Sequence, residues 1–526
     1  MRKLDRQASD TLAGPLAEDR PSAGGSGAFL KHAVVYGFGS MMLQVASVVL
    51  VPLYTRHLTP ADFGVLEILT RTGQIISVFL MGTGVTVATF TFYCQAKTDR
   101  ERQETAASVA TLMLALLVVG GLPCVALSGV LGQLIGVDDS SLVALGVLAA
   151  LCDALPLVPL VLVQARTQST FYVFIALTMF IGKVLAVTVA VVGLGLGVRG
   201  ILLASIVTSS IVGCALHIVE FWRWQFRPRM TLLWKASRFA LPFLPGGLCF
   251  FILANGDRYF LIRYAGREEL GVYALGCKLA MAVGMFSFTP LFQVWSARMY
   301  GVFARPDAAA LVGRACSRML AAYVFVGLGV CIFAKEVIEL LASPQYARAA
   351  VVVPAIVSAY FFYYAAIFTE GAFYVAHRTG VKPWIALASM TVMCGLYLTL
   401  IPRFGATGAA WAALGGFMFQ AAATWTVAQR IIPVRYEYGR LAGMIASAAA
   451  IAILASRLNL GMMTIPAKLI LAAAWPALLW TSGLVRQDEK AAVRAGAARF
   501  LHWPVGRLLP SVRQHDTPIR TSPNDP

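Results

Sequence analysis

The stretch PLYTRHLTPADFGVLEILTRT (52–72) has a counterpart 207 residues later, YFLIRYAGREELGVYALGCKL (259–279). Two shorter segments match at nearly the same offset: 175–177 with 385–387, and Gly197-x-x-Gly200 with Gly405-x-x-Gly408. This near-constant offset predicts an internal repeat, with chance matching among Gly-, Ala- and Val-rich helices as the alternative. The longest match pairs Arg56 with Arg263, Asp62 with Glu269, Gly64-Val65 with Gly271-Val272, and Arg71 with Lys278.

The composition indicates that the repeated segments belong to a membrane protein. Hydrophobic residues make up 59% of the 526 residues and charged residues only 13%, whereas a soluble domain carries about 25% charge. A spanning helix needs about 20 mostly apolar residues, and such runs recur along the chain. We therefore expect an all-α polytopic membrane protein with about 14 transmembrane helices. They are expected at 30–55, 61–92, 105–127, 141–163, 171–194, 200–222, 238–262, 269–297, 308–333, 349–374, 381–401, 407–429, 438–456 and 466–484.

The repeat offset covers six helices. Because six is even, the two halves share one orientation, as in parallel-repeat transporters whose substrate site lies between lobes near the midplane. Two helices at the C-terminal end lie outside the repeat. The expected parts are a disordered cytoplasmic tail (1–29), an N-lobe with helices 1–6 (30–222), a C-lobe with helices 7–12 (238–430), helices 13 and 14 (436–485) and a basic cytoplasmic tail (486–526).

The loops set the expected orientation. Those on the N-terminal side hold 28 Lys and Arg residues, and the opposite loops hold 9. Positive residues gather in cytoplasmic loops, so both termini are expected on the cytoplasmic side of the membrane. Topology thus accounts for the net charge of +18, and nucleic acid is not an expected partner.

Enzyme signatures are absent from the sequence. The nine Cys form no CxxC pair, and there is no HExxH, Walker loop or GxSxG. The expected outer loops are too short to hold an enzyme domain. We therefore expect a transporter with no catalytic residue, no metal site and no cofactor.

Ionisable residues inside the expected helices mark a candidate site, since each costs about 2.5–3.5 kcal/mol to insert. Arg71 and Lys278 each lie about ten residues into a helix, hence about 15 Å deep at one level. Arg71 has Glu67 four residues earlier as an alternative partner. Lys278 has only Ala274 and Ala282 at that spacing, which favours an anionic ligand or a partner on another helix.

Further polar residues extend this candidate cavity. Lys183 is a third intramembrane cation, with Asp153 and Glu370 as candidate partners. Coupling to a H⁺ or Na⁺ gradient is left open, with Glu67, Asp153 and Glu370 as candidate ion ligands. A cleft lined by cations favours a phosphate or diphosphate ligand. Helical stripes add Gln44 and Gln74 to the expected polar walls.

Two features of the sequence predict shape. Pro242 and Pro245, in the run LPFLPGG (241–247), are expected to kink helix 7, as a hinge or as a static bend. The aromatic run 360–364 (YFFYY) suits stacking on sugars or packing against lipid and neighbouring helices.

Three helix–helix junctions in the sequence resemble those of the Wzx-type polysaccharide flippases. That family shares a superfamily with the MATE exporters and the lipid II flippases (the MOP superfamily). VPLYTRHLTPADFGVLEIL (51–69) is similar to the family's opening, and RFGATGAAWA (403–412) to its helix 11–12 junction. ANGDRYFLIRYAGREELGVYALGCKLA (254–280) resembles its helix 7–8 junction, in which Asp257 and Arg258 match the motif and have a structural role as the alternative.

The resemblance, over about residues 30–430, implies a V-shaped pair of six-helix lobes. It also implies a flippase that translocates undecaprenyl-diphosphate-linked oligosaccharide by alternating access, for surface polysaccharide such as O-antigen, exopolysaccharide or capsule. Arg71 and Lys278 resemble the cavity cations proposed to meet the diphosphate. Membrane lipids and polysaccharide polymerase or export proteins are the implied partners. Alternatives are a MATE-like drug or cation antiporter and a lipid II flippase, although helix 1 lacks the basic residues that lipid II flippases carry there.

Overall fold

The computed structural model describes residues 49–80, 82–224, 227–457, 463–482, 487 and 490. Within these residues every regular element is a helix. Most of expected helix 1, including Gln44, and nearly all of both expected tails lie outside the described residues. The chain divides into two units, 1–459 and 460–526, and each is considered by itself.

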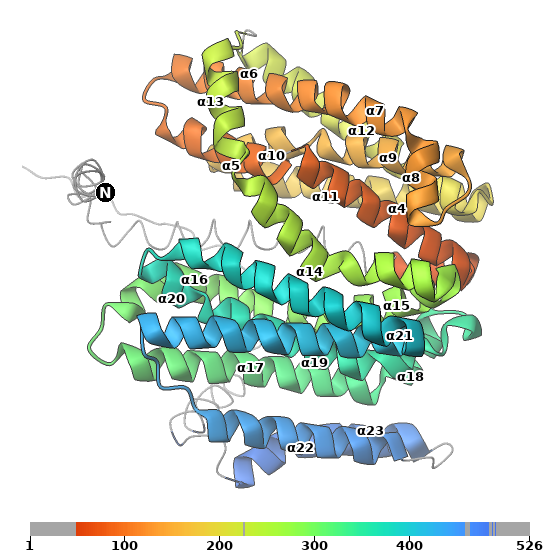
Figure 1. Ribbon diagram of the computed structural model, residues 1–526, viewed down its shortest axis with the longest axis vertical. Coiled ribbons are helices and arrows are strands. Elements are labelled where there is room, and N and C mark those ends of the chain that lie inside the picture. The colour runs from red at the N-terminus through yellow and green to blue at the C-terminus, as the bar shows by residue number, and fades with distance from the viewer. Residues whose placement is uncertain are drawn as a thin grey trace, which may run out of the picture. The chain divides into compact units, whose positions relative to one another are not determined.

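The N-terminal half of the first unit follows the expected order of helices (Figure 1). Its expected helices often appear as two consecutive segments, because Gly and Pro interrupt the runs. The segments are α3 (Val51–His57), α4 (Pro60–Phe79), α5 (Gly82–Gln95), α6 (Asp99–Leu116), η1 (Leu117–Gly121), α7 (Leu122–Ala126), α8 (Ser128–Ile135), α9 (Ser140–Ala154), α10 (Leu157–Ala165), α11 (Ser169–Thr188), η2 (Val189–Gly193) and α12 (Gly197–Trp224).

The C-terminal half of the first unit repeats that order, and α22 (Tyr438–Arg457) then packs on α17. The second unit contributes one described helix, α23 (Thr464–Thr481). The repeated half comprises α13 (Met230–Ala240), α14 (Phe243–Tyr264), α15 (Gly266–Phe286), α16 (Phe288–Phe303), α17 (Ala308–Ile332), α18 (Ala334–Leu341), η3 (Pro344–Tyr346), α19 (Ala349–Thr369), α20 (Gly371–Val375), η4 (Thr379–Val381) and α21 (Lys382–Ile431).

The sequence TPAD fixes the start of α4. The Thr59 side chain accepts a hydrogen bond from the Asp62 backbone N–H, and the Asp62 side chain accepts one from the Thr59 backbone N–H. This capping box satisfies two donors that the first turn would otherwise leave unpaired. Pro60 follows at the first helical position, where no N–H is needed.

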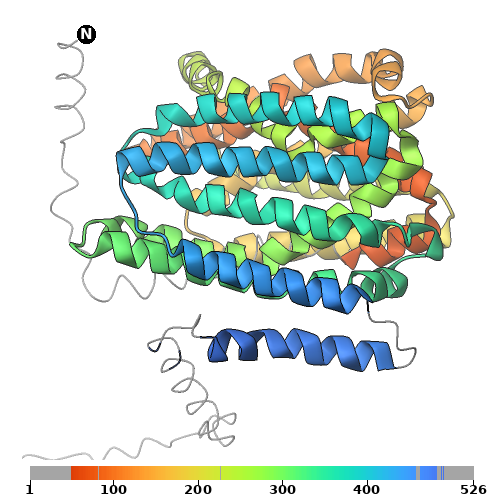
Figure 2. The ribbon, with the colours of Figure 1, turned by 60° about the horizontal axis from the view of Figure 1, so that its bottom comes forward.

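Gly405 turns α21 back on itself. It has φ 55° and ψ −129° inside an otherwise helical run, a conformation that favours glycine. A Cβ added at Gly415 would touch Leu396, and one at Gly416 would overlap Met393. Figures 1 and 2 show the two halves of α21 side by side. The expected helices 11 and 12 are therefore both present, joined by the RFGATG turn.

The two halves of the first unit meet through equivalent residues. A Cβ added at Gly64 would overlap the carbonyl oxygen of Arg267, and one at Gly271 would overlap that of Pro60. The offset of 207 relates Gly64 to Gly271 and Pro60 to Arg267. The contact is thus two-fold symmetric, as a parallel repeat requires, and α3 on α18 mirrors α14 on α8.

Hydrogen bonds and an ion pair also join the two halves near the Gly64–Gly271 contact. We call this region the junction end (residues 55–64 and 263–271). Thr55 Oγ1 donates to the Leu341 carbonyl oxygen at 2.8 Å, and the Tyr346 hydroxyl donates to the Leu58 carbonyl oxygen at 3.1 Å. Arg267 Nη2 lies 2.6 Å from Asp138 Oδ2.

The helix count of 14 is not confirmed. Ten helices in the described residues are long and apolar enough to cross a membrane, or up to 12 if each of two bent pairs is one span. The 53-residue stretch from Thr379 to Ile431, which contains the Gly405 turn, counts as one of the ten.

Expected helix 7 is longer than predicted and broken. It begins at Met230 rather than at 238, and α13 and α14 meet at an angle of 43°. Pro242 caps α14, and Pro242 and Pro245 both lack the N–H that an unbroken helix would use. The α13 segment packs on α5 and α6 of the N-terminal half, whereas α14 packs mainly on α21 and also on α4 and α15.

Candidate functional site

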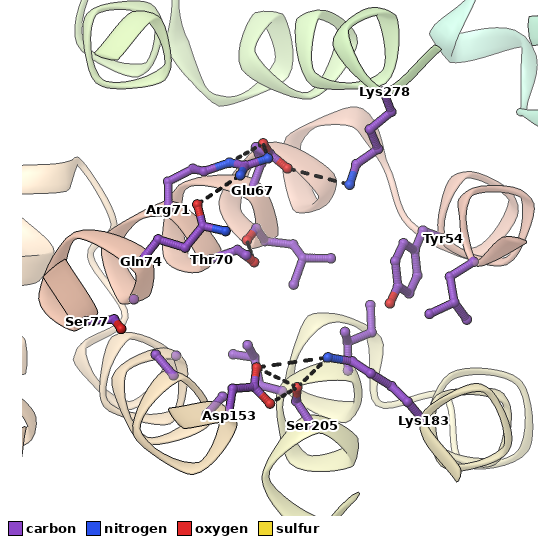
Figure 3. Close-up of a pocket in the computed structure, with 18 of the residues that line it drawn as sticks. Tyr54, Glu67, Thr70, Arg71, Gln74, Ser77, Asp153, Lys183, Ser205 and Lys278 are labelled. Carbon is purple, nitrogen blue, oxygen red and sulfur yellow. Dashed lines mark hydrogen bonds and ion pairs between the residues drawn. The ribbon is translucent and has the colours of Figure 1, made fainter. Parts of the chain in front are cut away.

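A cavity of about 610 Å³ lies where α4 and α15 face α9, α11 and α12. Its wall includes five of the predicted cavity residues from widely separated helices, together with Gln74 (Figure 3). The lining residues used below are Tyr54, Glu67, Thr70, Arg71, Gln74, Ser77, Asp153, Lys183, Ser205, Lys278, Met281, Met285, Thr289 and Tyr364.

Glu67 is the centre of the charge network. Arg71, one turn later on α4, places Nη2 at 2.7 Å and Nε at 2.8 Å from Glu67 Oε1. Lys278 Nζ, from α15, lies 3.9 Å from Glu67 Oε2. The intrahelical pair considered for Arg71 is therefore present, and the partner of Lys278 is on another helix.

Arg258 approaches Glu67 from the side away from the cavity. Its Nε lies 3.4 Å from Glu67 Oε1, and its Nη1 lies 2.7 Å from Asp257 Oδ1. The Tyr273 hydroxyl donates to Asp257 Oδ2 at 2.6 Å. Both junction-motif residues are buried, at 4% and 2% exposure, so they hold the network in place and do not line the main cavity.

A second polar cluster faces this network across the cavity. Lys183 Nζ donates to Ser205 Oγ at 2.9 Å and lies 4.0 Å from Asp153 Oδ2. Ser205 and Ser209 both donate to the Asp153 carboxylate. Asp153 is therefore the partner of Lys183 in the structure, as one of the two predicted candidates.

The described lining of the cavity carries more positive than negative charge. Arg71, Lys183 and Lys278 line it together with two carboxylates, Glu67 and Asp153. The two carboxylates balance two of the three cations, which leaves a net charge of +1 on this lining. Such a lining attracts an anion, and charge-assisted hydrogen bonds from Arg and Lys suit phosphate oxygens.

Uncharged donors continue the wall along α4. Thr70, Gln74 and Ser77 lie on the face that carries Glu67 and Arg71. Arg71 Nη1 donates to Gln74 Oε1 at 2.9 Å, which fixes the side-chain amide. In Figure 3 the Gln74 amide nitrogen points into the cavity.

Other predicted site residues lie elsewhere. Glu370 does not line the cavity; its Oε2 lies 2.7 Å from Lys382 Nζ. Pro242 and Pro245 lie at the helix bend. Sequence reasoning missed Tyr54 and Ser205, whereas Tyr364 belongs to the aromatic run 360–364, for which stacking on sugars was one alternative. The polar stripe of expected helix 1, which includes Gln44 and Ser47, reaches Tyr54 after two further turns.

A family model described as "Polysaccharide biosynthesis protein" matches residues 53–351. A comparison with curated protein sequences finds no match.

Solved structures share the fold. The structure titled "Lipid II flippase MurJ, inward closed conformation" superposes with a TM-score of 0.71 at 9% identity, covering 86% of this chain and 100% of that one. An inward-facing multidrug resistance MATE transporter of the MOP superfamily gives 0.61 at 14% identity, covering 76% and 97%. A Vibrio cholerae MATE transporter gives 0.54 at 15% identity, covering 76% and 95%. At these identities the likeness establishes the fold alone, a multi-pass helical membrane fold shared with these structures.

Proposed function

Since the chain belongs to the polysaccharide biosynthesis protein family, we propose that it is a flippase for a lipid-linked oligosaccharide. The substrate is an oligosaccharide on undecaprenyl diphosphate, carried from the cytoplasmic to the outer leaflet of the inner membrane for surface polysaccharide. The lipid tail stays in the bilayer while the charged head crosses through the cavity. Polysaccharide polymerase or export proteins are the proposed downstream partners.

One observation carries this proposal: cations from both halves of the repeat converge on one cavity. Arg71 comes from α4 and Lys278 from α15, and both share Glu67 as a counter-ion. At 3.9 Å Lys278 Nζ is beyond hydrogen-bond distance of Glu67, so its three donors are available to an anion. A diphosphate provides oxygens for both cations at once.

The contacts at the junction end suit alternating access. With both termini in the cytoplasm, the junction end faces outward, and its hydrogen bonds close the cavity on that side. Opening toward the outer leaflet then requires α4 and α15 to separate at Gly64 and Gly271. Coupling to H⁺ or Na⁺ is part of the proposal, with Asp153 and Glu67 as cavity carboxylates.

The test is substitution of the cavity cations in the producing cell. Arg71→Ala and Lys278→Ala should each reduce surface polysaccharide and cause the lipid-linked precursor to accumulate inside. Lys335→Ala is the matched control, because Lys335 is 73% exposed on α18 and pairs weakly with Glu339 at 3.9 Å. Normal export by both cavity variants at normal protein levels would refute the role of the cations.

Lipid II is the second candidate substrate, favoured by the complete coverage of the lipid II flippase structure. It carries the same diphosphate, so the cavity alone does not separate the two. Depletion of the protein distinguishes them: loss of surface polysaccharide with intact cell-wall synthesis favours the first, and lysis favours the second. A drug or cation antiporter fits less well, because its substrate would meet the excess positive charge.

A further inference from the structure

Tyr364 differs from the other aromatic residues that line the cavity. Tyr54 and Phe63 are buried at 8% and 1% exposure. Tyr364, from α19, is only partly buried and lines the same cavity. It is therefore the ring, among the described lining residues, that a ligand can reach.

The absence of a side chain at Gly284 creates the space for this ring. A Cβ added at Gly284 would overlap the hydroxyl oxygen and two ring carbons of Tyr364. The ring therefore lies directly against the α15 backbone. Any larger residue at 284 would have to displace it.

Neighbouring side chains hold the ring in place. The Tyr364 centroid lies 4.6 Å from that of Phe288 and 5.4 Å from that of Tyr323. A ring fixed on these sides loses little conformational entropy when a ligand stacks on its open side.

The distance from the cations suits a substrate head group. Gly284 follows Lys278 by six residues, which is about 9 Å along a helix. This is comparable with a diphosphate joined to one pyranose ring. Met281, a flexible apolar side chain on the cavity wall, lies between the two positions, and Met285, also on the wall, follows Gly284 directly.

The chemistry around Tyr364 matches a sugar. A pyranose has an apolar C–H face, which packs on an aromatic ring, and hydroxyl edges, which need hydrogen-bond partners. The Gln74 amide, fixed by Arg71, and the side chains of Thr70 and Ser77 line the same cavity from α4. An apolar platform with a few placed polar groups is the usual form of a small-ligand site.

We propose that Tyr364, positioned by Gly284, is the stacking platform for the sugar attached directly to the lipid diphosphate, and so a specificity-determining residue. This inference rests on the proposed function. Arg71 and Lys278 bind the diphosphate in both the sugar-free and the sugar-bearing lipid. Tyr364 contributes only when the sugar is present.

The experiment compares two probes on the purified full chain in lipid nanodiscs. They are undecaprenyl diphosphate and undecaprenyl diphosphate carrying one glucose, with Kd measured by native mass spectrometry. Tyr364→Leu should weaken binding of the glucose-bearing lipid about fivefold, since aromatic stacking contributes about 0.5–1.5 kcal/mol. Binding of the sugar-free lipid should change less than about twofold.

Two further variants sharpen the comparison. Gly284→Ala displaces the ring while Tyr364 remains, and should produce the same selective loss. Tyr364→Phe keeps the ring and should retain most of the preference for the sugar-bearing lipid. Phe362→Ala is the control, because Phe362 lies on the same helix and does not line the cavity.

The outcomes separate the two proposals. Equal weakening of both lipids by Tyr364→Leu, or no change in either, would overturn the stacking role while leaving the flippase proposal intact. A wild-type protein that binds neither lipid would overturn the flippase proposal and the sugar site with it. Loss of both lipids in Lys278→Ala, beside selective loss in Tyr364→Leu, supports both.

Discussion

Replacing Gly271 with alanine places a methyl group against the carbonyl oxygen of Pro60, where α15 and α4 meet at the junction end. A backbone carbonyl cannot rotate away as a side chain can, so the helices must separate. Overpacking of this kind costs about 1–3 kcal/mol. In a state open at the junction end the two helices are apart and the methyl group costs nothing.

The substitution should therefore shift the equilibrium toward the junction-open state by about fivefold to 150-fold. Gly64→Ala should act in the same direction, because its added methyl group meets Arg267 in the symmetric contact. Gly329→Ala on α17 is the control, since nothing lies within 4 Å of an added Cβ there.

The assay is labelling from outside the cell by a membrane-impermeant maleimide. A single cysteine at position 70, in a background without the nine native cysteines, reports on the cavity because Thr70 lines it and is exposed. Labelling should be faster in Gly271→Ala and Gly64→Ala than in Gly329→Ala. Equal rates in all three, with correctly folded protein, would refute the role of the glycine contact in closing the cavity.

Three other perturbations have defined outcomes. Glu67→Gln should lower the free energy of unfolding in detergent by about 3 kcal/mol, because it removes a shared partner of three cations in a buried network; an unchanged melting temperature would contradict this. Cysteines at Asp138 and Arg267, joined by a bifunctional thiol reagent, should stop transport until the link is reduced; transport through the linked protein would show that the junction end need not open. Gly405→Ala should cost about 1–2 kcal/mol because of the positive φ, whereas Gly395→Ala, in open space within the same helix, should be neutral or stabilising.

Much of the fold was predictable because lipid imposes simple rules on sequence. Apolar runs predicted most of the helices. The segments that contain Gly64 and Gly271 predicted the internal repeat. The match of Gly64 with Gly271 proved to be a contact, since close backbone approach excludes a side chain at both positions. The break between α13 and α14 was anticipated from the prolines, but the start of α13 was not: its basic, amphipathic sequence falls below the hydropathy of a spanning helix.

The candidate site was only partly predictable. Helical spacing correctly placed Glu67, Arg71 and Gln74 on one face, and local pairing identified Arg71 with Glu67 as one alternative. Spacing says nothing about partners from other helices. The approach of Arg258 to Glu67 across 191 residues and the pairing of Glu370 with Lys382 therefore appear only in three dimensions.

The broken helix formed by α13 and α14 packs on both halves of the first unit. Its first segment packs on the N-terminal half and its second mainly on α21, so we expect a rotation of one half relative to the other to change the angle between the segments. At the break Leu241 donates back to Ser237 and Leu244 to Leu241, while Pro242 and Pro245 have no donors to lose. Bending there breaks few hydrogen bonds, whereas stretching is resisted by covalent bonds. We therefore expect the bend between α13 and α14 to be the place where this connection changes shape when the two halves move relative to each other.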